Sequence, residues 1–274
     1  MTDLPHNEGP TPVAALYRRP DRRVALITGG GSGAGAAIAR AYAALGARVV
    51  VSDIDYTLAG AVAGEIRAAG GLALAHRCDV ANEEQVTGLI GRAQREFGAL
   101  SYVVNTAGPC LTGDPLAHWQ RIVAANLQGT MHMTRHAIEA MKGRGGSIVN
   151  VAADAGLGFG AADQPAYGAA KAGVMRFTAA LGFLQPDFGI RVNCIVPDFI
   201  ATEYRLASLE GLGATERAAR GIPESITTPG QFAAAVIELA GREDCAGRVV
   251  LCRSGQALEL IEFGDPGFRR LETF

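Results

Sequence analysis

The feature that most constrains the fold is a regular alternation of short apolar, β-forming runs with longer stretches at helical spacing. The apolar runs span residues 23–28, 48–53, 72–80, 100–108, 147–153, 190–197 and 248–252. The first of them, RVALIT, has no polar face, as expected of a strand that helices cover on both sides. The alternation therefore predicts an α/β fold in which a doubly wound, seven-stranded parallel sheet is flanked by helices.

This pattern covers most of the chain and shows neither an internal repeat nor a second domain. We predict a single Rossmann-type domain over residues 23–252, a flexible N-terminal arm over 1–22 and a C-terminal extension over 253–274. The N-terminal segment lacks the apolar stretch of a signal peptide. Residues 198–228 have no clear period and fit a mobile cap over a site.

Composition narrows the class of protein. Apolar residues make up 49% of the chain and the formal net charge is −2, which favours a globular protein and argues against nucleic-acid partners. No apolar run approaches the roughly 18 residues that cross a membrane. Five dispersed cysteines without a metal-ligand spacing indicate a reducing, cytoplasmic environment. His132 and His136 lie four residues apart, a spacing that could hold a metal, but we predict a surface or subunit-contact role and no metal.

A glycine-rich stretch, TGGGSGAG (28–35), lies between the first strand and its helix. Glycines let such a turn tighten and bring backbone N–H groups close to a pyrophosphate at the helix N-terminus. Asp53 ends the second strand, where its carboxylate can accept hydrogen bonds from both hydroxyls of an adenine ribose. A 2′-phosphate would meet that negative charge, and no arginine lies in the turn or at position 54, so the pattern favours NAD over NADP. The alternative is an ordinary glycine loop with a helix-capping aspartate.

Tyr167 and Lys171 lie four residues apart on a predicted helix, so both side chains project from one face. An adjacent ammonium and a positively charged nicotinamide would lower the pKa of a phenol from its usual value near 10 and suit it to general acid/base work. A flexible lysine can also donate to a cofactor ribose. The alternative is a core-facing tyrosine beside a lysine whose ammonium reaches solvent.

With the turn and the Tyr–Lys pair, four further motifs give the chain its resemblance to the short-chain dehydrogenase/reductase family over about residues 22–252. These motifs are CDV (78–80), NTAG (105–108), Asn126 in AANLQGT, and VPDFIAT (196–202). The resemblance implies an NAD(H)-dependent oxidoreductase that interconverts a small-molecule secondary alcohol and a ketone. Tyr167 would be the general acid/base and Lys171 its electrostatic partner. Asn126 would distort the long helix and expose a backbone carbonyl to a water that relays protons to Lys171.

The resemblance also implies a set of cofactor contacts and an assembly. The implied cofactor residues are Gly29, Ser32, Gly33, Gly35, Asp53, Asp79, Val80, Asn105, Ala107, Gly108, Tyr167, Lys171, Pro197, Ile200 and Thr202. The two long helices would pair across subunits and give a homotetramer or a homodimer. In the family a glycine follows the proline that corresponds to Pro197, whereas here Asp198 follows it. The family's glycine-rich ending after the last strand is also absent, and this absence puts the second tetramer interface in doubt.

The largest departure from the family is the missing catalytic serine. Counting back from Tyr167 places Asp154 at that position, whereas aligning on the strand places Ala153 there. Loss of one hydrogen-bond donor to the substrate oxygen typically costs ~10²–10³ in rate. Asp154 could act as an acid if burial kept it protonated, or another group such as Thr106 or a water could donate. Asp154 could instead only cap the turn, with ketone reduction slow or lost.

Two other functions stay open on the sequence. The chain could be a nucleotide-binding scaffold with little dehydrogenase activity, which the missing serine favours and the intact Tyr167–Lys171 pair opposes. It could also catalyse a related NAD-assisted epimerisation or elimination with Asp154 as base. The substrate pocket would be built by residues 109–115, 155–166 and 198–228, and none of these segments carries a decodable signature for the substrate.

Overall fold

The computed structural model describes residues 23–109, 117–158, 164–207, 209–219, 222–223 and 225–261. The predicted N-terminal arm, residues 1–22, lies outside the described residues. The strands are β1 Val24–Thr28, β2 Arg48–Asp53, β3 Leu72–Arg77, β4 Leu100–Asn105, β5 Gly146–Val151, β6 Ile190–Pro197, β7 Val249–Cys252 and β8 Glu259–Ile261. They form one sheet in the order β3-β2-β1-β4-β5-β6-β7-β8.

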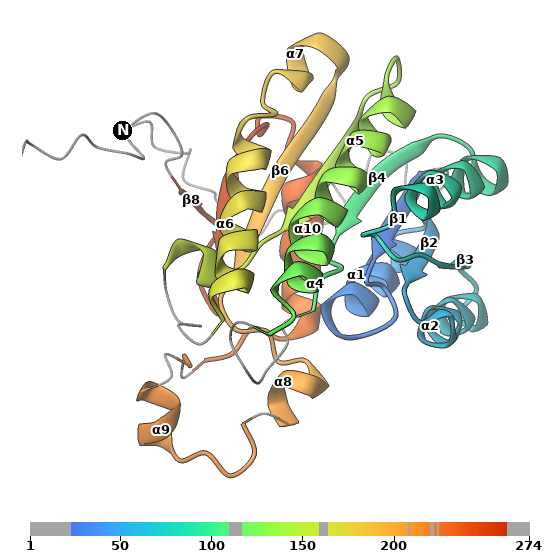
Figure 1. Ribbon diagram of the computed structural model, residues 1–274. Coiled ribbons are helices and arrows are strands. Elements are labelled where there is room, and N and C mark those ends of the chain that lie inside the picture. Colours follow the sequence, from blue (N-terminus) through green and yellow to red (C-terminus); the bar gives the residue numbers. More distant parts are fainter. Residues whose placement is uncertain are drawn as a thin grey trace, which may run out of the picture.

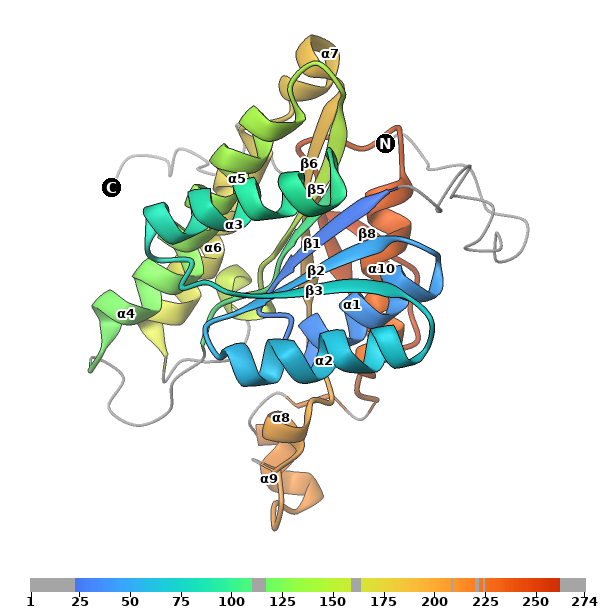
Figure 2. The ribbon, with the colours of Figure 1, turned by 90° about the vertical axis from the view of Figure 1, so that its right-hand side faces the viewer.

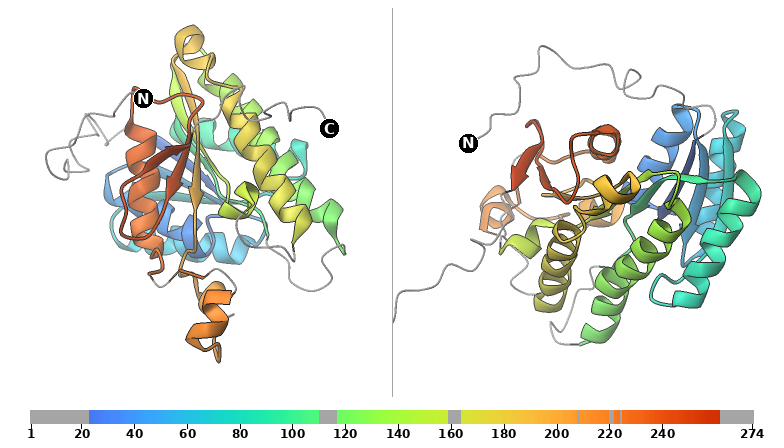
Figure 3. Two further views of the ribbon diagram at one scale, coloured as in Figure 1. Left: turned by 90° about the vertical axis from the view of Figure 1, so that its left-hand side faces the viewer. Right: turned by 90° about the horizontal axis from the view of Figure 1, so that it is seen from above.

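Helices cover both faces of this sheet, as Figure 3 shows in the view from above. The helices are α1 Gly33–Ala44, α2 Tyr56–Ala68, α3 Glu83–Phe97, α4 Trp119–Val123, α5 Gly129–Met141, α6 Pro165–Ala179, α7 Leu184–Phe188, α8 Glu203–Ala207, α9 Ala214–Ala219 and α10 Pro229–Gly241. Helices α1, α2 and α10 pack on one face, and α3, α5 and α6 pack on the other. This confirms the predicted doubly wound α/β fold.

The sheet has eight strands, one more than the seven predicted. Strands β1 to β7 are parallel, whereas β8 pairs antiparallel with β7, with Val250 opposite Leu260. The extra strand comes from residues 259–261, within the segment predicted as a C-terminal extension. Its sequence, ELI, is too short to show a strand period, and only its pairing with β7 defines it as a strand.

Several predicted elements are shorter than expected, and the apolar runs 100–108 and 147–153 end as strands at Asn105 and Val151. The third strand ends at Arg77 rather than at residue 80, because the chain turns at Asp79, whose carboxylate accepts a hydrogen bond from the Ala81 N–H at 3.0 Å. The long helix predicted around Asn126 is divided into α4, a π-helical turn (η3, Ala124–Gln128) and α5.

The core lies between the sheet and the two helical layers. Tyr42 and Phe232 are fully buried on the α1/α10 face, and the rings of Tyr42 and Tyr102 lie 5.2 Å apart between centroids. Met133 and Met141 of α5 are fully buried on the other face. Within the described part of the chain, none of the helices has the length and apolar character needed to span a bilayer.

Segments at the carboxyl ends of the strands are gathered at one edge of the sheet. Helices α8 and α9 extend beyond this edge from the body of the molecule, as Figures 1 and 2 show. They occupy the region, residues 198–228, that was predicted to form a cap. The candidate site is therefore built at this edge.

Candidate active site

The strand order reverses direction between β1 and β4, because the chain passes from β1 outward to β3 and then returns to β4 on the other side. In open α/β sheets a ligand crevice forms at such a switch point, beyond the carboxyl ends of the strands. Thr28 and Asn105, the last residues of β1 and β4, lie in register with one another. The glycine-rich turn and the NTAG segment are thereby brought side by side.

The glycine turn is held by very close backbone packing. Gly29 has a φ of 62°, and a Cβ built there would lie 2.9 Å from the Ala107 Cα. A Cβ on Gly35 would lie 2.0 Å from the Gly29 carbonyl oxygen. Side chains larger than hydrogen at these two positions would force apart the turn, the start of α1 and the segment after β4.

The N-terminus of α1 is left available for an anion. Ser32 is its N-cap residue but makes no capping hydrogen bond, and no acidic residue lies in the first turn. The first N–H groups of a helix have no acceptor within the helix and carry the positive end of its dipole. Thr202 lies beside this end, since its Cγ2 is 3.0 Å from a Cβ built on Gly33. Its neighbour Ile200 forms an isolated bridge with Thr227.

Asp53 lies at the carboxyl end of β2 with both carboxylate oxygens engaged by the backbone. Its Oδ2 accepts from the Gly31 N–H at 3.0 Å and its Oδ1 accepts from the Asp55 N–H at 3.1 Å. These bonds fix the carboxylate against the glycine turn. Each oxygen can accept a further hydrogen bond, so Asp53 keeps the capacity to bind hydroxyls.

Asn105 is buried and belongs to a polar layer that the sequence analysis did not identify. Its Nδ2 donates to Asn150 Oδ1 at 2.8 Å and to Thr134 Oγ1 at 3.2 Å. Asn150 Nδ2 in turn donates to Thr178 Oγ1 at 3.0 Å. This layer joins β4, α5, β5 and α6 beneath the edge of the site. A signal was present in the sequence, because polar residues interrupt otherwise apolar strands.

Asn126 lies in the π-helical turn and is fully buried. Its Nδ2 donates to the carbonyl oxygens of Pro109 and Ile122, each at 3.0 Å, and its backbone carbonyl accepts from Thr130 Oγ1 at 2.8 Å. A Cβ on Gly108 would lie 2.1 Å from Asn126 Oδ1, so glycine is required there. The side chain thus ties the long-helix region to the segment after β4.

Tyr167 and Lys171 lie on the same side of α6. Lys171 is 3% exposed, and its Nζ donates to the Val151 carbonyl at 2.9 Å, at the end of β5. The same Nζ lies 5.5 Å from the centroid of the Tyr167 ring, and Tyr167 is half-buried. A buried ammonium is therefore held close to a phenol at the carboxyl edge of the sheet.

The residues at the expected serine position differ in their surroundings. Ala153 is buried, whereas Asp154 begins a short 3₁₀ turn (η4, Asp154–Leu157) and is partly exposed. Asp154 Oδ1 accepts from the Ala155 N–H at 2.8 Å. Burial raises the pKa of Asp154 from 3.8 to about 6, and the nearby Asp198 carboxylate adds to the rise. Asp198 itself follows Pro197, which is buried at the end of β6.

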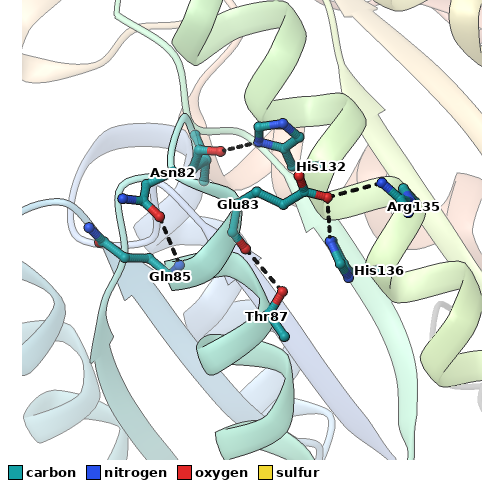
Figure 4. A network of polar contacts seen from close by, with 8 residues as sticks. Asn82, Glu83, Gln85, Thr87, His132, Arg135 and His136 are labelled. Carbon is teal, nitrogen blue, oxygen red and sulfur yellow. Dashed lines mark hydrogen bonds and ion pairs between the residues drawn. The ribbon is translucent and has the colours of Figure 1, made fainter.

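Asp79 and Val80 lie in the loop between β3 and α3, and histidines of α5 contact this loop and the first residue of α3. His132 Nδ1 lies 3.2 Å from the Val80 carbonyl oxygen, and His136 Nε2 lies 2.8 Å from Glu83 Oε1. Figure 4 shows the Glu83 carboxylate directed at both His136 and Arg135. The two histidines thus connect α5 to the start of α3.

The remaining sequence-predicted segments of the substrate pocket are described only in part. Cys110 and its neighbours up to residue 116 lie outside the described residues, as do residues 159–163. The site that the structure describes therefore consists of the glycine turn, Asp53, the NTAG segment, Asn126, the end of β5, α6 and the segment after β6.

Comparison with known proteins identifies clear relatives. A family model described as short chain dehydrogenase matches residues 23–211. The cis-4-hydroxycyclohexanecarboxylate dehydrogenase of Sinomonas cyclohexanicum is 38% identical over 237 residues, which are 83% of this chain and 92% of that protein. The cyclohexanol dehydrogenase of Acinetobacter sp. (strain SE19) is 37% identical over 190 residues, 66% of this chain and 74% of that protein.

A solved structure shares the whole architecture. The crystal structure of a protein from Burkholderia xenovorans that is described as a short-chain dehydrogenase/reductase superposes with a TM-score of 0.77 at 28% identity. The match covers 86% of this chain and 96% of the other.

Proposed function

Because this chain belongs to the short-chain dehydrogenase family, we propose that it interconverts a secondary alcohol and a ketone with NAD(H), through Tyr167 and Lys171. Membership makes it an oxidoreductase that acts on CH–OH groups and uses a nicotinamide cofactor. The observation that carries the rest of the proposal is the buried Lys171 ammonium, 5.5 Å from the centroid of the Tyr167 ring at the carboxyl edge of the sheet.

The residues present fit a dinucleotide. The first turn of α1 has neither an acidic side chain nor a side-chain cap, so its N–H groups suit a pyrophosphate. The residues that would hold the cofactor are those predicted: the glycine turn, Asp53, Asp79–Val80, the NTAG segment, Tyr167, Lys171, Pro197, Ile200 and Thr202. When bound, the cofactor supplies hydride exchange at its nicotinamide ring.

The preference for NAD over NADP rests on the fixed carboxylate of Asp53. Backbone N–H groups hold both of its oxygens, so the side chain does not swing away from the turn. A carboxylate there accepts hydrogen bonds from ribose hydroxyls and repels a phosphate. We therefore infer that NAD is the cofactor.

In the reaction, Tyr167 exchanges a proton with the substrate oxygen. The Lys171 ammonium stabilises the phenolate that forms in alcohol oxidation, and its bond to the Val151 carbonyl keeps it in place. The π turn supports the predicted role of Asn126, because it interrupts the regular α-helix at this residue. In the predicted role, the backbone carbonyl of Asn126, which accepts from Thr130 Oγ1 at 2.8 Å, also binds the relay water.

Asp154 is proposed as an auxiliary hydrogen-bond donor to the substrate oxygen, in the place of the missing serine. Burial raises its pKa to about 6, so the carboxyl group carries a proton in an appreciable fraction of molecules below that pH. Above pH 6, the ionised carboxylate repels the negative charge that develops on the substrate oxygen. On this proposal Asp154→Ala, which removes the donor, lowers the rate of ketone reduction at pH 6. If Asp154 has no part in the reaction, Asp154→Ala leaves the rate unchanged, and restoring a hydroxyl with Ala153→Ser or Asp154→Ser raises it.

The substrate is proposed to be a ring-borne secondary alcohol or the matching cyclic ketone. The relatives named for cis-4-hydroxycyclohexanecarboxylate and for cyclohexanol support this class. The location is proposed to be the cytoplasm, since Cys78, Cys194, Cys245 and Cys252 are buried free thiols, as in proteins of reducing compartments.

The decisive experiment combines turnover with cofactor binding. Purified enzyme is assayed for NADH formation with cyclohexanol and cis-4-hydroxycyclohexanecarboxylate, and NADH binding is followed by calorimetry. We expect Tyr167→Phe to reduce turnover at least about a thousandfold while the Kd for NADH changes little. Turnover that survives this substitution refutes the role of Tyr167, and NADP binding tighter than NAD binding refutes the cofactor preference.

A further inference from the structure

A shallow, open cavity at the surface, next to the turn after β2, is not yet explained by the proposed reaction. It has a volume of about 370 Å³ and is lined by Ile54, Asp55, Tyr56, Thr57 and Arg77. These residues come from the turn after β2, the first turn of α2 and the end of β3, which lie together at one end of the molecule in Figure 2. One lining residue, Ile54, directly follows Asp53, whose carboxylate is proposed to bind the adenine ribose.

Arg77 is brought to this cavity by strand pairing. Asp53 and Arg77, 24 residues apart in the sequence, are paired in register on the parallel strands β2 and β3. Residues paired in register on neighbouring strands project their side chains from the same face of a sheet. The sequence argument for NAD considered arginines only in the glycine turn and at position 54. The tertiary structure adds one from the next strand.

The Arg77 guanidinium is held in place but keeps most of its donors for a ligand. Its Nε donates to the Ile54 carbonyl at 3.2 Å, and the residue is exposed. Among the described residues, Arg77 forms no ion pair. The terminal nitrogens of a guanidinium form a planar fork that matches two oxygens of a phosphate.

Two carboxylates, those of Asp53 and Asp55, lie at the same turn after β2 and carry the opposite charge. Asp53 is fixed by the N–H groups of Gly31 and Asp55, and Asp55 Oδ1 accepts from the Thr57 N–H at 2.8 Å as the N-cap of α2. A 2′-phosphate on the ribose would meet both negative charges as well as the guanidinium. The choice between the two dinucleotides thus depends on a balance of opposing charges.

We propose that Arg77 is a specificity-determining residue of the cofactor site. Its guanidinium binds a ribose 2′-phosphate once the negative charge of Asp53 or Asp55 is removed. This inference rests on the proposed cofactor site around Asp53. NAD preference then comes from the carboxylates rather than from a lack of positive charge. A single neutralising substitution is sufficient to admit the phosphorylated cofactor, and the gain requires Arg77.

The test measures binding of two adenosine probes by calorimetry, without turnover. The probes are adenosine 5′-diphosphate and adenosine 2′,5′-bisphosphate, and the measured quantity is the ratio of their Kd values. In the natural protein we expect the diphosphate to bind more tightly. In Asp53→Asn, which keeps one acceptor oxygen for the backbone, we expect the ratio to shift toward the bisphosphate by about tenfold.

Arg77 is then removed in the same background. We expect Asp53→Asn/Arg77→Gln to lose the shift and Asp53→Asn/Arg77→Lys to keep part of it, because lysine retains the charge but not the fork. Arg92→Gln is the matched control, since it removes an exposed arginine of α3 that pairs with Glu96 and does not line the cavity. This control keeps the full shift.

A second pair of variants guards against failed folding of Asp53→Asn. Asp55→Ser removes a charge from the cavity and keeps a side-chain acceptor for the Thr57 N–H. We expect a smaller shift toward the bisphosphate, again abolished by Arg77→Gln. A shift that persists without Arg77 overturns the inference, as does the absence of a shift in both carboxylate variants when the natural protein binds the diphosphate. Failure of the natural protein to bind either probe overturns the proposed cofactor site and this inference with it.

Discussion

The carboxyl group of Asp154 changes its charge close to neutral pH, because burial raises its pKa from 3.8 to about 6. The folded protein therefore holds this proton more tightly than the unfolded chain does. The free energy of unfolding that Asp154 contributes is highest below pH 3.8 and is lost as the pH rises from 3.8 to about 6.

This linkage gives a prediction for stability. The free energies of unfolding of the natural protein and of Asp154→Asn are measured in denaturant between pH 4 and pH 7. We expect the variant to become more stable relative to the natural protein as the pH rises. Glu210→Gln, at an exposed position near α8, serves as the control and should show no such trend. A difference that does not vary with pH would contradict the raised pKa.

At the scale of single elements, the start of α1 depends on how closely it approaches the glycine turn. A Cβ on Gly35 would lie 2.0 Å from the Gly29 carbonyl, whereas a Cβ on Gly60, in the middle of α2, meets nothing within 4 Å. Both glycines lie within helices, so alanine improves helix propensity equally at the two positions. Any difference between the two variants then reports the space available for the methyl group.

We expect opposite results from alanine at these two glycines. Gly60→Ala should stabilise the protein by about 0.5–1 kcal/mol, because alanine is the better helix former and has room for its methyl group. Gly35→Ala should destabilise it by about 1–3 kcal/mol or more and weaken NADH binding, because the turn must move. Unfolding in urea and calorimetry measure the two effects, and equal changes in both variants would contradict the packing explanation.

At the scale of the whole molecule, the predicted homotetramer or homodimer places the surfaces of α5 and α6 between subunits. Met131 of α5 and Trp119 of α4 are exposed in the single chain, at 39% and 51%. Exposed large apolar side chains on a long helix are consistent with a subunit contact. Strand β8 covers the edge of β7, so any second contact across the sheet edge must involve β8 instead.

Light scattering should therefore give a mass of two or four chains in solution. Met131→Glu would bury an uncompensated charge in the predicted contact, and we expect the concentration needed for assembly to rise at least about tenfold. Gly88→Glu on α3, where a new side chain meets nothing within 4 Å, should leave assembly unchanged. A monomer in the natural protein would contradict the prediction, as would a Met131→Glu variant that assembles normally.

The sequence by itself determined the features that depend on local backbone geometry. Strand–helix alternation, the glycine turn before α1 and the four-residue spacing of Tyr167 and Lys171 follow from side-chain period and from the freedom of glycine. The π turn at Asn126 was expected only through the resemblance, because its distortion depends on buried contacts with Pro109 and Ile122.

The tertiary structure decided the features that depend on the register in which strands pair and on contacts between residues far apart in the chain. Arg77 reaches the side of Asp53 because β2 and β3 pair in one particular register, and β8 exists only because it pairs with β7. Asp154 differs from an ordinary surface aspartate because the fold buries it beside Asp198. Hydrogen bonds between strands and desolvation in the fold depend on residues far apart in the chain, and no local pattern encodes them.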